Sequence, residues 1–198
     1  MKTKMYLFIL LFISFSHLLI GQSSVKDFFI PKENNNLSNF STKLWDVQIW
    51  YIPISDTNYK IVEANFYQGK LINKRTSYIT ITEKEIKVTK VEFGTDNVIN
   101  YNPSTIWVKM PENSNTSKFE YKNNAEVNEC TAEWTEVIID GQKKKAIKIK
   151  YQAVIDGQLY EGWNYKYYVE GIGLWKTELS NGTTSMEFIN QQYDATIK

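Results

Sequence analysis

The chain has 198 residues, with 23 lysine and arginine side chains against 22 aspartate and glutamate side chains. Lys2 and Lys4 stand in a leading segment that we expect to be removed, which leaves 21 basic against 22 acidic groups, a net charge of −1. A near-neutral chain has no long-range field to attract nucleic acid or anionic membrane surfaces, so nucleic acid is not an expected partner.

Cysteine and histidine usage excludes several kinds of catalytic site. Cys130 is the one cysteine of the sequence, so no intramolecular disulfide can form. His17 is the one histidine and lies in the leading segment, so the mature chain should lack Ser-His and Cys-His pairs and His-ligated zinc. No acidic run has the spacing of a calcium loop. We therefore expect neither a metal nor another cofactor, and a non-catalytic role is favoured over an enzymatic one.

Residues 1–21 have the pattern of a secretory signal peptide. Two early lysines precede an apolar run from Met5 to Ile20, and the small residue Gly21 precedes a polar stretch. A membrane anchor is the alternative, but this run of about 16 residues is shorter than the roughly 20 that span a bilayer. The segment predicts an exported protein, periplasmic or secreted, with no stable membrane anchor after cleavage.

Residues 22–41 differ in composition from the rest of the chain. The stretch KENNNLSNFST is polar, rich in asparagine and without a clear period. We expect residues 22–41 to be a flexible lead-in, within which Phe28-Phe29-Ile30 is the segment able to dock on the domain. Residues 42–198 are then expected to form a single antiparallel β domain.

From residue 42 onward the dominant signal is alternation of apolar and polar side chains. In TSYITIT, Ile79 and Ile81 fall on one face while Tyr78 and Thr80 fall on the other, which is the period of a β-strand. No helical periodicity of comparable strength is found. The alternating runs predict strands at 44–52, 60–67, 76–82, 86–93, 104–110, 117–122, 130–139, 146–155, 163–170, 174–179 and 184–189.

Three dipeptides between these runs are typical of tight hairpin turns. Asp140-Gly141, Asp156-Gly157 and Asn181-Gly182 tolerate the positive φ angles of a type I′ turn. Consecutive hairpins make a meander, and a long meander curls under its own twist. The predicted fold class is therefore all-β: a curved antiparallel meander that forms a half-barrel or barrel-like sheet.

Gly171-Ile172-Gly173 poses a choice between a ligand loop and a bend. A dinucleotide-binding loop needs a third glycine three residues after the second and then a helix. Lys176 occupies that position, and the following residues alternate as a strand does. We interpret Gly171 and Gly173 as a structural bend, a corner of the sheet where another backbone comes close.

The stretch from Tyr167 to Glu178, Tyr-Tyr-x-x-Gly-Ile-Gly-Leu-Trp-Lys-x-Glu, resembles a motif of exported bacterial proteins of unknown function. That motif reads Tyr-Tyr-Ala-x-Gly-Val-Gly-Leu-Val-Lys-x-Glu near their C-terminus. This chain departs from it at Val169-Glu170 and at Trp175. The resemblance implies a fold similar to the curved half-barrels of periplasmic lipoprotein carriers and an exported location. It implies no catalytic residues.

Aromatic side chains supply the candidate ligand-binding residues. Trp163, Tyr165 and Tyr167 share one strand face, while Lys166 and Tyr168 share the other. An aromatic strand face can stack on sugars or line an apolar pocket, but it can equally build the core. Other tryptophans are candidates for the core first: Trp45, Trp50, Trp107 and Trp134.

The remaining chemically active side chains carry weaker signals. Glu129 and Glu133 share a strand face about 13 Å apart, farther than the roughly 5–10 Å that separate a glycosidase pair, so a solvated face is favoured. Cys130 alternates with apolar residues and is expected to be buried and unreactive. The basic run at 143–145 is expected to be a solvated hairpin arm.

Taken together, these patterns favour a non-catalytic exported β-protein. Its curved, aromatic-bearing sheet is expected to bind an apolar or glycan ligand, such as a lipid, or an envelope protein. One alternative is a carboxylate-dependent hydrolase of the glycosidase kind, which needs two facing acids in a cleft. Another is a structural or adhesion module that associates through sheet edges.

Overall fold

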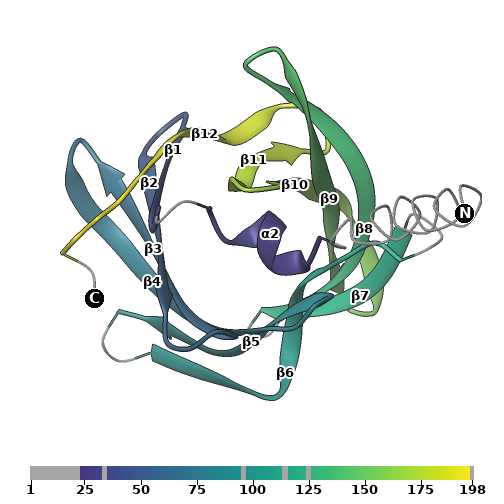
Figure 1. Ribbon diagram of the computed structural model, residues 1–198. Helices are drawn as coiled ribbons and strands as arrows, with labels where there is room; N and C mark the ends of the chain where they lie inside the picture. The colour runs from purple at the N-terminus through teal and green to yellow at the C-terminus, as the bar shows by residue number, and fades with distance from the viewer. Residues whose placement is uncertain (1–22, 33–34, 95–96, 113–115, 124–125, 197–198) are drawn as a thin grey trace, which may run out of the picture.

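The computed structural model describes residues 23–32, 35–94, 97–112, 116–123 and 126–196. The predicted signal peptide lies outside this part of the chain. Within it, twelve strands form one antiparallel sheet that curls into a nearly closed barrel (Figure 1). The all-β, barrel-like prediction is confirmed. The strands are β1 (Leu37–Thr42), β2 (Asp46–Pro53), β3 (Asn58–Tyr67), β4 (Lys70–Ile81), β5 (Glu85–Phe93), β6 (Asn97–Lys109), β7 (Thr116–Asn123), β8 (Glu126–Ile139), β9 (Gln142–Ile155), β10 (Gln158–Val169), β11 (Gly173–Leu179) and β12 (Thr184–Gln192).

The strand order makes two meanders joined through the first and last strands. The order across the sheet is β6-β5-β4-β3-β2-β1-β12-β11-β10-β9-β8-β7. The two edge strands, β6 and β7, come together and close the barrel through side-chain hydroxyl groups. Thr105 Oγ1 accepts a bond of 2.7 Å from the amide of Lys122, and Ser117 Oγ donates 2.8 Å to the carbonyl of Met110. Between these two edge strands, side-chain hydroxyl groups therefore take the place of some of the backbone–backbone hydrogen bonds that normally pair neighbouring strands.

Strand β1 corrects the expectation of a flexible lead-in over residues 22–41. It pairs with β2 on one side and β12 on the other, with Leu37 and Phe40 buried. Pairing with β12 shifts register between Asn39 and Phe40, and this bulge breaks the alternation that would have marked a strand. The Asn39 side chain bonds to Asn190 at 2.8 Å and Gln48 at 3.1 Å, so a polar sequence is satisfied within the sheet.

A short helix, α2 (Val25–Phe29), lies inside the ring of strands and closes one end of the barrel (Figure 1). Five residues cannot form a stable helix alone, so tertiary contacts must hold it. The amide of Val25 donates to the carbonyl of Glu83 in the β4–β5 turn at 2.9 Å, and the carbonyl of Asp27 accepts 2.7 Å from Gly171. This helix also lies in the expected lead-in, and it fulfils the expectation that the Phe28-Phe29-Ile30 segment docks.

Aromatic packing around α2 forms the centre of the core. Phe28 and Phe29 are almost completely buried. The Phe29 ring stacks on Tyr168 with centroids 5.6 Å apart and meets Trp107 edge-on at 5.2 Å. Phe28 lies 5.3 Å from Trp134. Trp107 is thus a core residue as expected and Trp134 packs against the core.

The other two tryptophans expected in the core lie elsewhere. Trp50 is half-buried on the outer face, where its indole donates to Asp194 at 3.0 Å. Trp45 is 40% exposed in the β1–β2 turn, so its assignment to the core was wrong. Trp45 precedes Val47, the first buried residue of β2, so it lies at the rim of the barrel and not within it.

The hairpin turns follow the sequence signals with one exception. Asp140-Gly141 and Asp156-Gly157 have positive φ at both residues, as a type I′ turn requires. Asn181 does not have positive φ, and a four-residue connection from 180 to 183 replaces the expected tight turn there. Gln68-Gly69 adopts the same positive φ pair without an Asn or Asp to signal it.

Gly171 lies in the turn between β10 and β11 and Gly173 begins β11, which corrects the expectation of a bend within a continuous ribbon. Both have positive φ, 77° and 86°. A Cβ on Gly173 would lie 2.8 Å from the carbonyl oxygen of Phe29. Another backbone does come close, as expected, and it belongs to α2. No helix follows Gly173, because β11 begins there.

Candidate functional site

The structure places the expected aromatic stripe on the outer face of the barrel. Tyr165 pairs with Lys150 and Tyr167 with Lys148, whereas Lys166 pairs with Ile149, which is fully buried. Because directly opposed residues point to the same side of a sheet, the stripe faces outward and Lys166 faces inward.

Lysine side chains cover this outer stripe. The ammonium groups of Lys148, Lys150 and Lys176 lie 4.2, 4.4 and 4.6 Å from the ring centroids of Tyr165, Trp163 and Tyr167. These are cation–π distances. The stripe therefore neither lines the interior nor fills the core, and binding of a ligand by these three aromatics stays a prediction.

An internal cavity of about 160 Å³ lies directly beneath α2. Its lining is divided into an apolar part and a polar part. Aromatic and aliphatic side chains, including Phe29 of α2, form the part nearest the helix. Polar groups form the part toward the open end. The lining comprises Phe29, Ile49, Tyr51, Ile61, Glu63, Arg75, Trp107, Lys166, Tyr168, Leu174, Thr177 and Met186.

The polar part carries an excess of positive charge. Arg75 Nη2 lies 3.1 Å from Glu63 Oε2, and these two residues are directly opposed on β4 and β3. Lys166 enters from β10 and makes no ion pair with the described residues. Among the described lining residues, two cations therefore face one carboxylate.

The Lys166 ammonium group is held without a compensating partner. Burial, together with the charge of Arg75, lowers the pKa of Lys166 to about 8, while Glu63 opposes this shift. The ammonium lies 5.2 Å from the centroid of the Tyr151 ring, which gives a weaker stabilisation than a carboxylate would. Lys166 as a whole is half-buried, but an inward-facing ammonium group without an anionic partner destabilises the fold, so its position points to a role in binding.

Two buried polar atoms of the cavity lining, Arg75 Nε and Thr177 Oγ1, have no hydrogen-bond partner among the described residues. Two further atoms of this kind lie outside the lining: Asn164 Oδ1, and Trp163 Nε1 on the outer face of β10. Asn164 lies two residues before Lys166 on the same inward face of β10, and Lys166 pairs with Thr177. Buried polar groups in native proteins are normally satisfied by protein, water or ligand. Because two of these atoms line the cavity and Asn164 Oδ1 belongs to the same inward strand face as Lys166, this cavity is the candidate binding site.

The site lacks the features of the alternative catalytic mechanisms considered from the sequence. Glu63 is the carboxylate among the described lining residues, and Arg75 pairs with it, so no facing acid pair is formed there. Glu129 and Glu133 lie on the outer face of β8, where Glu133 pairs with Lys148 at 3.2 Å. No cluster of three potential metal ligands from His, Cys, Asp and Glu occurs in the described ranges.

Cys130 is buried within β8, as expected, with an exposed fraction of 2%. Burial raises the pKa of its thiol to about 12. We predict that iodoacetamide at pH 8 leaves Cys130 unmodified in the native protein and labels it fully in denaturant, because the thiolate is the reactive form. Mass spectrometry of the intact chain measures the modification. Rapid labelling of the native protein would contradict the burial of this strand position.

The charged lining residues were missed in the sequence because their faces could not be assigned to inside or outside. Lys166 shares a strand face with Tyr168, and a charge on the same face as a buried aromatic was the available signal. Arg75 and Glu63 come from strands adjacent in the chain, but their pairing depends on register. Alternation alone does not fix register.

Comparisons with known proteins add no assignment: no protein-family model, curated protein or solved structure matches this chain. The resemblance of residues 167–178 to exported bacterial proteins therefore stays an expectation. Across the described residues, no helix combines the length and apolarity needed to cross a bilayer.

Proposed function

We propose that the protein is an exported binding protein, and not an enzyme, whose barrel holds a small molecule with an anionic group and an apolar body. The observation that carries this proposal is the cavity lined by Lys166, Arg75 Nε and Thr177 Oγ1, with Asn164 Oδ1 on the same inward face of β10 as Lys166. An anionic group there would accept hydrogen bonds and offset the excess positive charge.

The size and polarity of the cavity define the class of ligand. About 160 Å³ equals the volume of roughly five water molecules at ~30 Å³ each, so the ligand, or the part of it that enters, is small. The apolar side, with Phe29 and Leu174, suits a short aliphatic or aromatic body. A small carboxylic acid meets both requirements, which narrows the apolar ligand expected from the sequence and disfavours a glycan inside the barrel.

The end of the barrel opposite α2 offers a route to the cavity. Glu63 and Arg75 side chains keep exposed fractions of 31% and 26% despite facing inward. The turns and the adjoining strand ends at this end also carry exposed apolar side chains, which an apolar ligand would meet first. These side chains are Leu44, Trp45, Tyr67, Leu71, Ile72, Val98, Ile155, Leu159, Tyr160 and Leu179.

The test compares Lys166→Met with Lys150→Met, a matched change on the outer face of the neighbouring strand. We would titrate aliphatic and aromatic monocarboxylates of four to ten carbons, and the corresponding primary amides, into each processed protein by calorimetry at pH 7. We expect carboxylates to bind and amides to bind much more weakly. Lys166→Met should weaken carboxylate binding at least tenfold, since a lost charge-assisted hydrogen bond is worth about 1.5–3 kcal/mol.

Unchanged affinity in Lys166→Met, equal loss in Lys150→Met, or the absence of binding by the whole panel would each refute the proposal. Arg75→Met is a less suitable variant because it leaves the half-buried, inward-facing Glu63 carboxylate without its partner.

The pH dependence of stability provides a second readout. In it, Lys166→Met should raise the free energy of unfolding at neutral pH, although the same substitution lowers affinity. The folded pKa of Lys166, about 8, lies below its ordinary value of 10.5, so the unfolded chain holds more protons between these two pH values. The free energy of unfolding should therefore rise with pH from about 8 to 10.5 through this group, and Lys166→Met should remove that rise.

Below pH 8 both states are protonated and the destabilisation by Lys166 is fully present. Lys166→Met should then be more stable than the wild type by about 3 kcal/mol at pH 7. Urea denaturation at pH 7 and pH 10 measures this difference. A substitution that raises stability while it lowers affinity identifies a binding residue, and a loss of stability at pH 7 would contradict the geometry of the site.

A further inference from the structure

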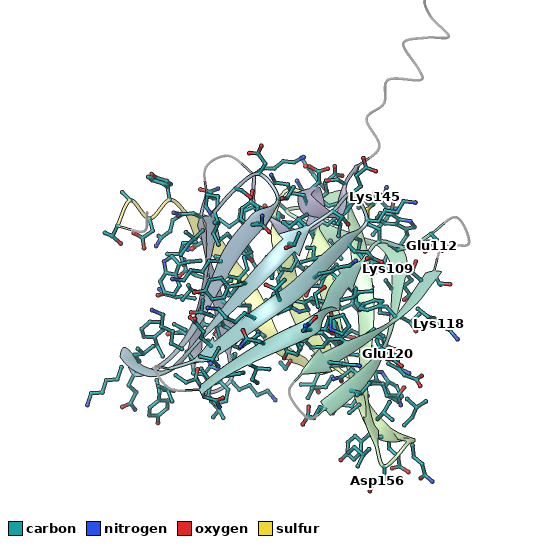
Figure 2. The ribbon with its side chains drawn as sticks, turned by 90° about the horizontal axis from the view of Figure 1, so that it is seen from below. Lys109, Glu112, Lys118, Glu120, Lys145 and Asp156 are labelled. Atoms are coloured by element: carbon teal, nitrogen blue, oxygen red, sulfur yellow. The ribbon has the colours of Figure 1, made fainter. Side chains whose placement is uncertain are left out.

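A second and larger cavity, of about 480 Å³, lies at the end of the barrel that α2 closes. Four separate segments build it: the connection after α2, the start of β9, the β10–β11 turn and β12. We call it the lysine cradle. Figure 2 shows Lys145 at this end and Asp156 of the β9–β10 turn at the opposite end. The cradle is lined by Lys32, Asn35, Gln142, Lys143, Lys144, Lys145, Glu170, Gly171, Ile172 and Gln191.

Positive charge dominates the lysine cradle although the processed chain is close to neutral. The described lining holds four ammonium groups and the carboxylate of Glu170. Glu170 lies 3.9 Å from Lys32, and Lys143 pairs at 2.9 Å with Glu136. Among the described residues, neither Lys144 nor Lys145 has a carboxylate partner, so two positive charges are uncompensated.

Lys145 is positioned by packing. Its ammonium lies 4.0 Å from the centroid of the Trp134 ring and 5.8 Å from that of Phe28. The basic run at 143–145 forms the start of β9 beside the β8–β9 turn and is largely exposed, as expected of a solvated hairpin arm. The structure also places it beside Lys32, which is 111 positions before Lys143 in the chain. This convergence was not visible in the sequence.

Backbone hydrogen bonds fix the floor of the lysine cradle. The amide of Lys32 donates 3.1 Å to the carbonyl of Gly171, and the amide of Glu170 donates 3.2 Å to that of Lys145. The side-chain amide of Gln191 donates to the carbonyl of Ile172. A site built on such connections needs little ordering when a ligand binds.

A second surface cavity provides an internal comparison. It measures about 420 Å³ and lies around the β4–β5 turn, with Lys84 and Lys109 facing Glu83, Glu85 and Glu112. Lys109 pairs with Glu112 at 3.0 Å. Similar size and opposite net charge make this cavity a matched control for the lysine cradle.

We propose that the lysine cradle binds a small molecule that carries two or more phosphate groups. Several compact ammonium groups around an open cavity suit multiply charged oxyanions, because each phosphate presents up to two charges and several acceptor oxygens. The side-chain amides of Asn35 and Gln142 can add donors. The volume lies within the range of about 300–1,000 Å³ typical of small-molecule sites. This site is separate from the barrel interior.

The experiment titrates inorganic tripolyphosphate into the processed protein by calorimetry at low ionic strength. We expect Lys144→Gln and Lys145→Gln each to weaken binding roughly fivefold, and the pair roughly 25-fold. Lys84→Gln with Lys109→Gln should leave binding unchanged. Lys166→Met should also leave it unchanged, which separates this site from the proposed interior site.

Citrate and orthophosphate complete the design. Both should bind more weakly than tripolyphosphate, and equal binding of citrate would refute the phosphate class. Absence of tripolyphosphate binding, or an equal loss in the Lys84 and Lys109 double variant, would refute the site itself. If Lys145→Gln lowers stability through its contact with Trp134, Lys144→Gln alone decides the outcome.

Discussion

Phe29→Ala should lower the free energy of unfolding by about 3–5 kcal/mol, the usual cost of truncating a buried phenylalanine. Phe29 has an exposed fraction of 3% and contacts Tyr168, Trp107 and Tyr51 through its ring. The loss should be large because α2 is too short to persist without this packing. Urea denaturation followed by tryptophan fluorescence measures it.

Two further variants keep this prediction testable. Phe29→Leu preserves most of the volume and should cost less than about 2 kcal/mol, so it should fold even if the alanine variant does not. Ile54→Ala, at a position 61% exposed after β2, should change stability by no more than about 0.5 kcal/mol. If Phe29→Ala costs as little as Ile54→Ala, then α2 does not pack inside the barrel.

Gly173→Ala should be nearly as damaging, at about 3–4 kcal/mol, for a different reason. The new Cβ would lie 2.8 Å from the carbonyl oxygen of Phe29, and φ at Gly173 is 86°. The positive φ contributes about 1–2 kcal/mol and displacement of the α2 backbone contributes the rest. Chemical denaturation measures the total.

Gly157→Ala separates these two contributions. Gly157 has φ of 75° in the β9–β10 turn, and no atom lies within 4 Å of its added Cβ. It should therefore lose about 1–2 kcal/mol through backbone strain alone. Equal losses at Gly157 and Gly173 would show that the β10–β11 turn does not support α2.

The barrel also explains how the chain is stabilised without an intramolecular disulfide. Its interior is filled from two sources, the inward side chains of the strands and the aromatic residues of α2. Where α2 stops, polar and charged side chains replace apolar ones, and the cavity lies at this boundary. The same helix thus completes the core and forms one wall of the proposed binding site.

Local patterns were sufficient for most of the strands. Each of the eleven runs recognised by alternation became a strand, from β2 to β12. Alternation is reliable here because each strand has one side facing the core and one facing solvent. Strand β1 was missed because its bulge and its polar side chains hide that period.

The sequence by itself determined which catalytic groups the chain contains, since it has one cysteine and one histidine, the latter in the leading segment. It also determined which side chains share a face of each strand, as with Trp163 on the face of β10 opposite to that of Lys166. Tertiary structure alone decided which face is inside. Closure of the barrel put Lys166 in the interior with Arg75 and Glu63, and it left the aromatic stripe outside under a layer of lysines. The physical reason is that alternation is a local property, whereas the direction of curvature and the register between strands depend on how the whole sheet closes around α2.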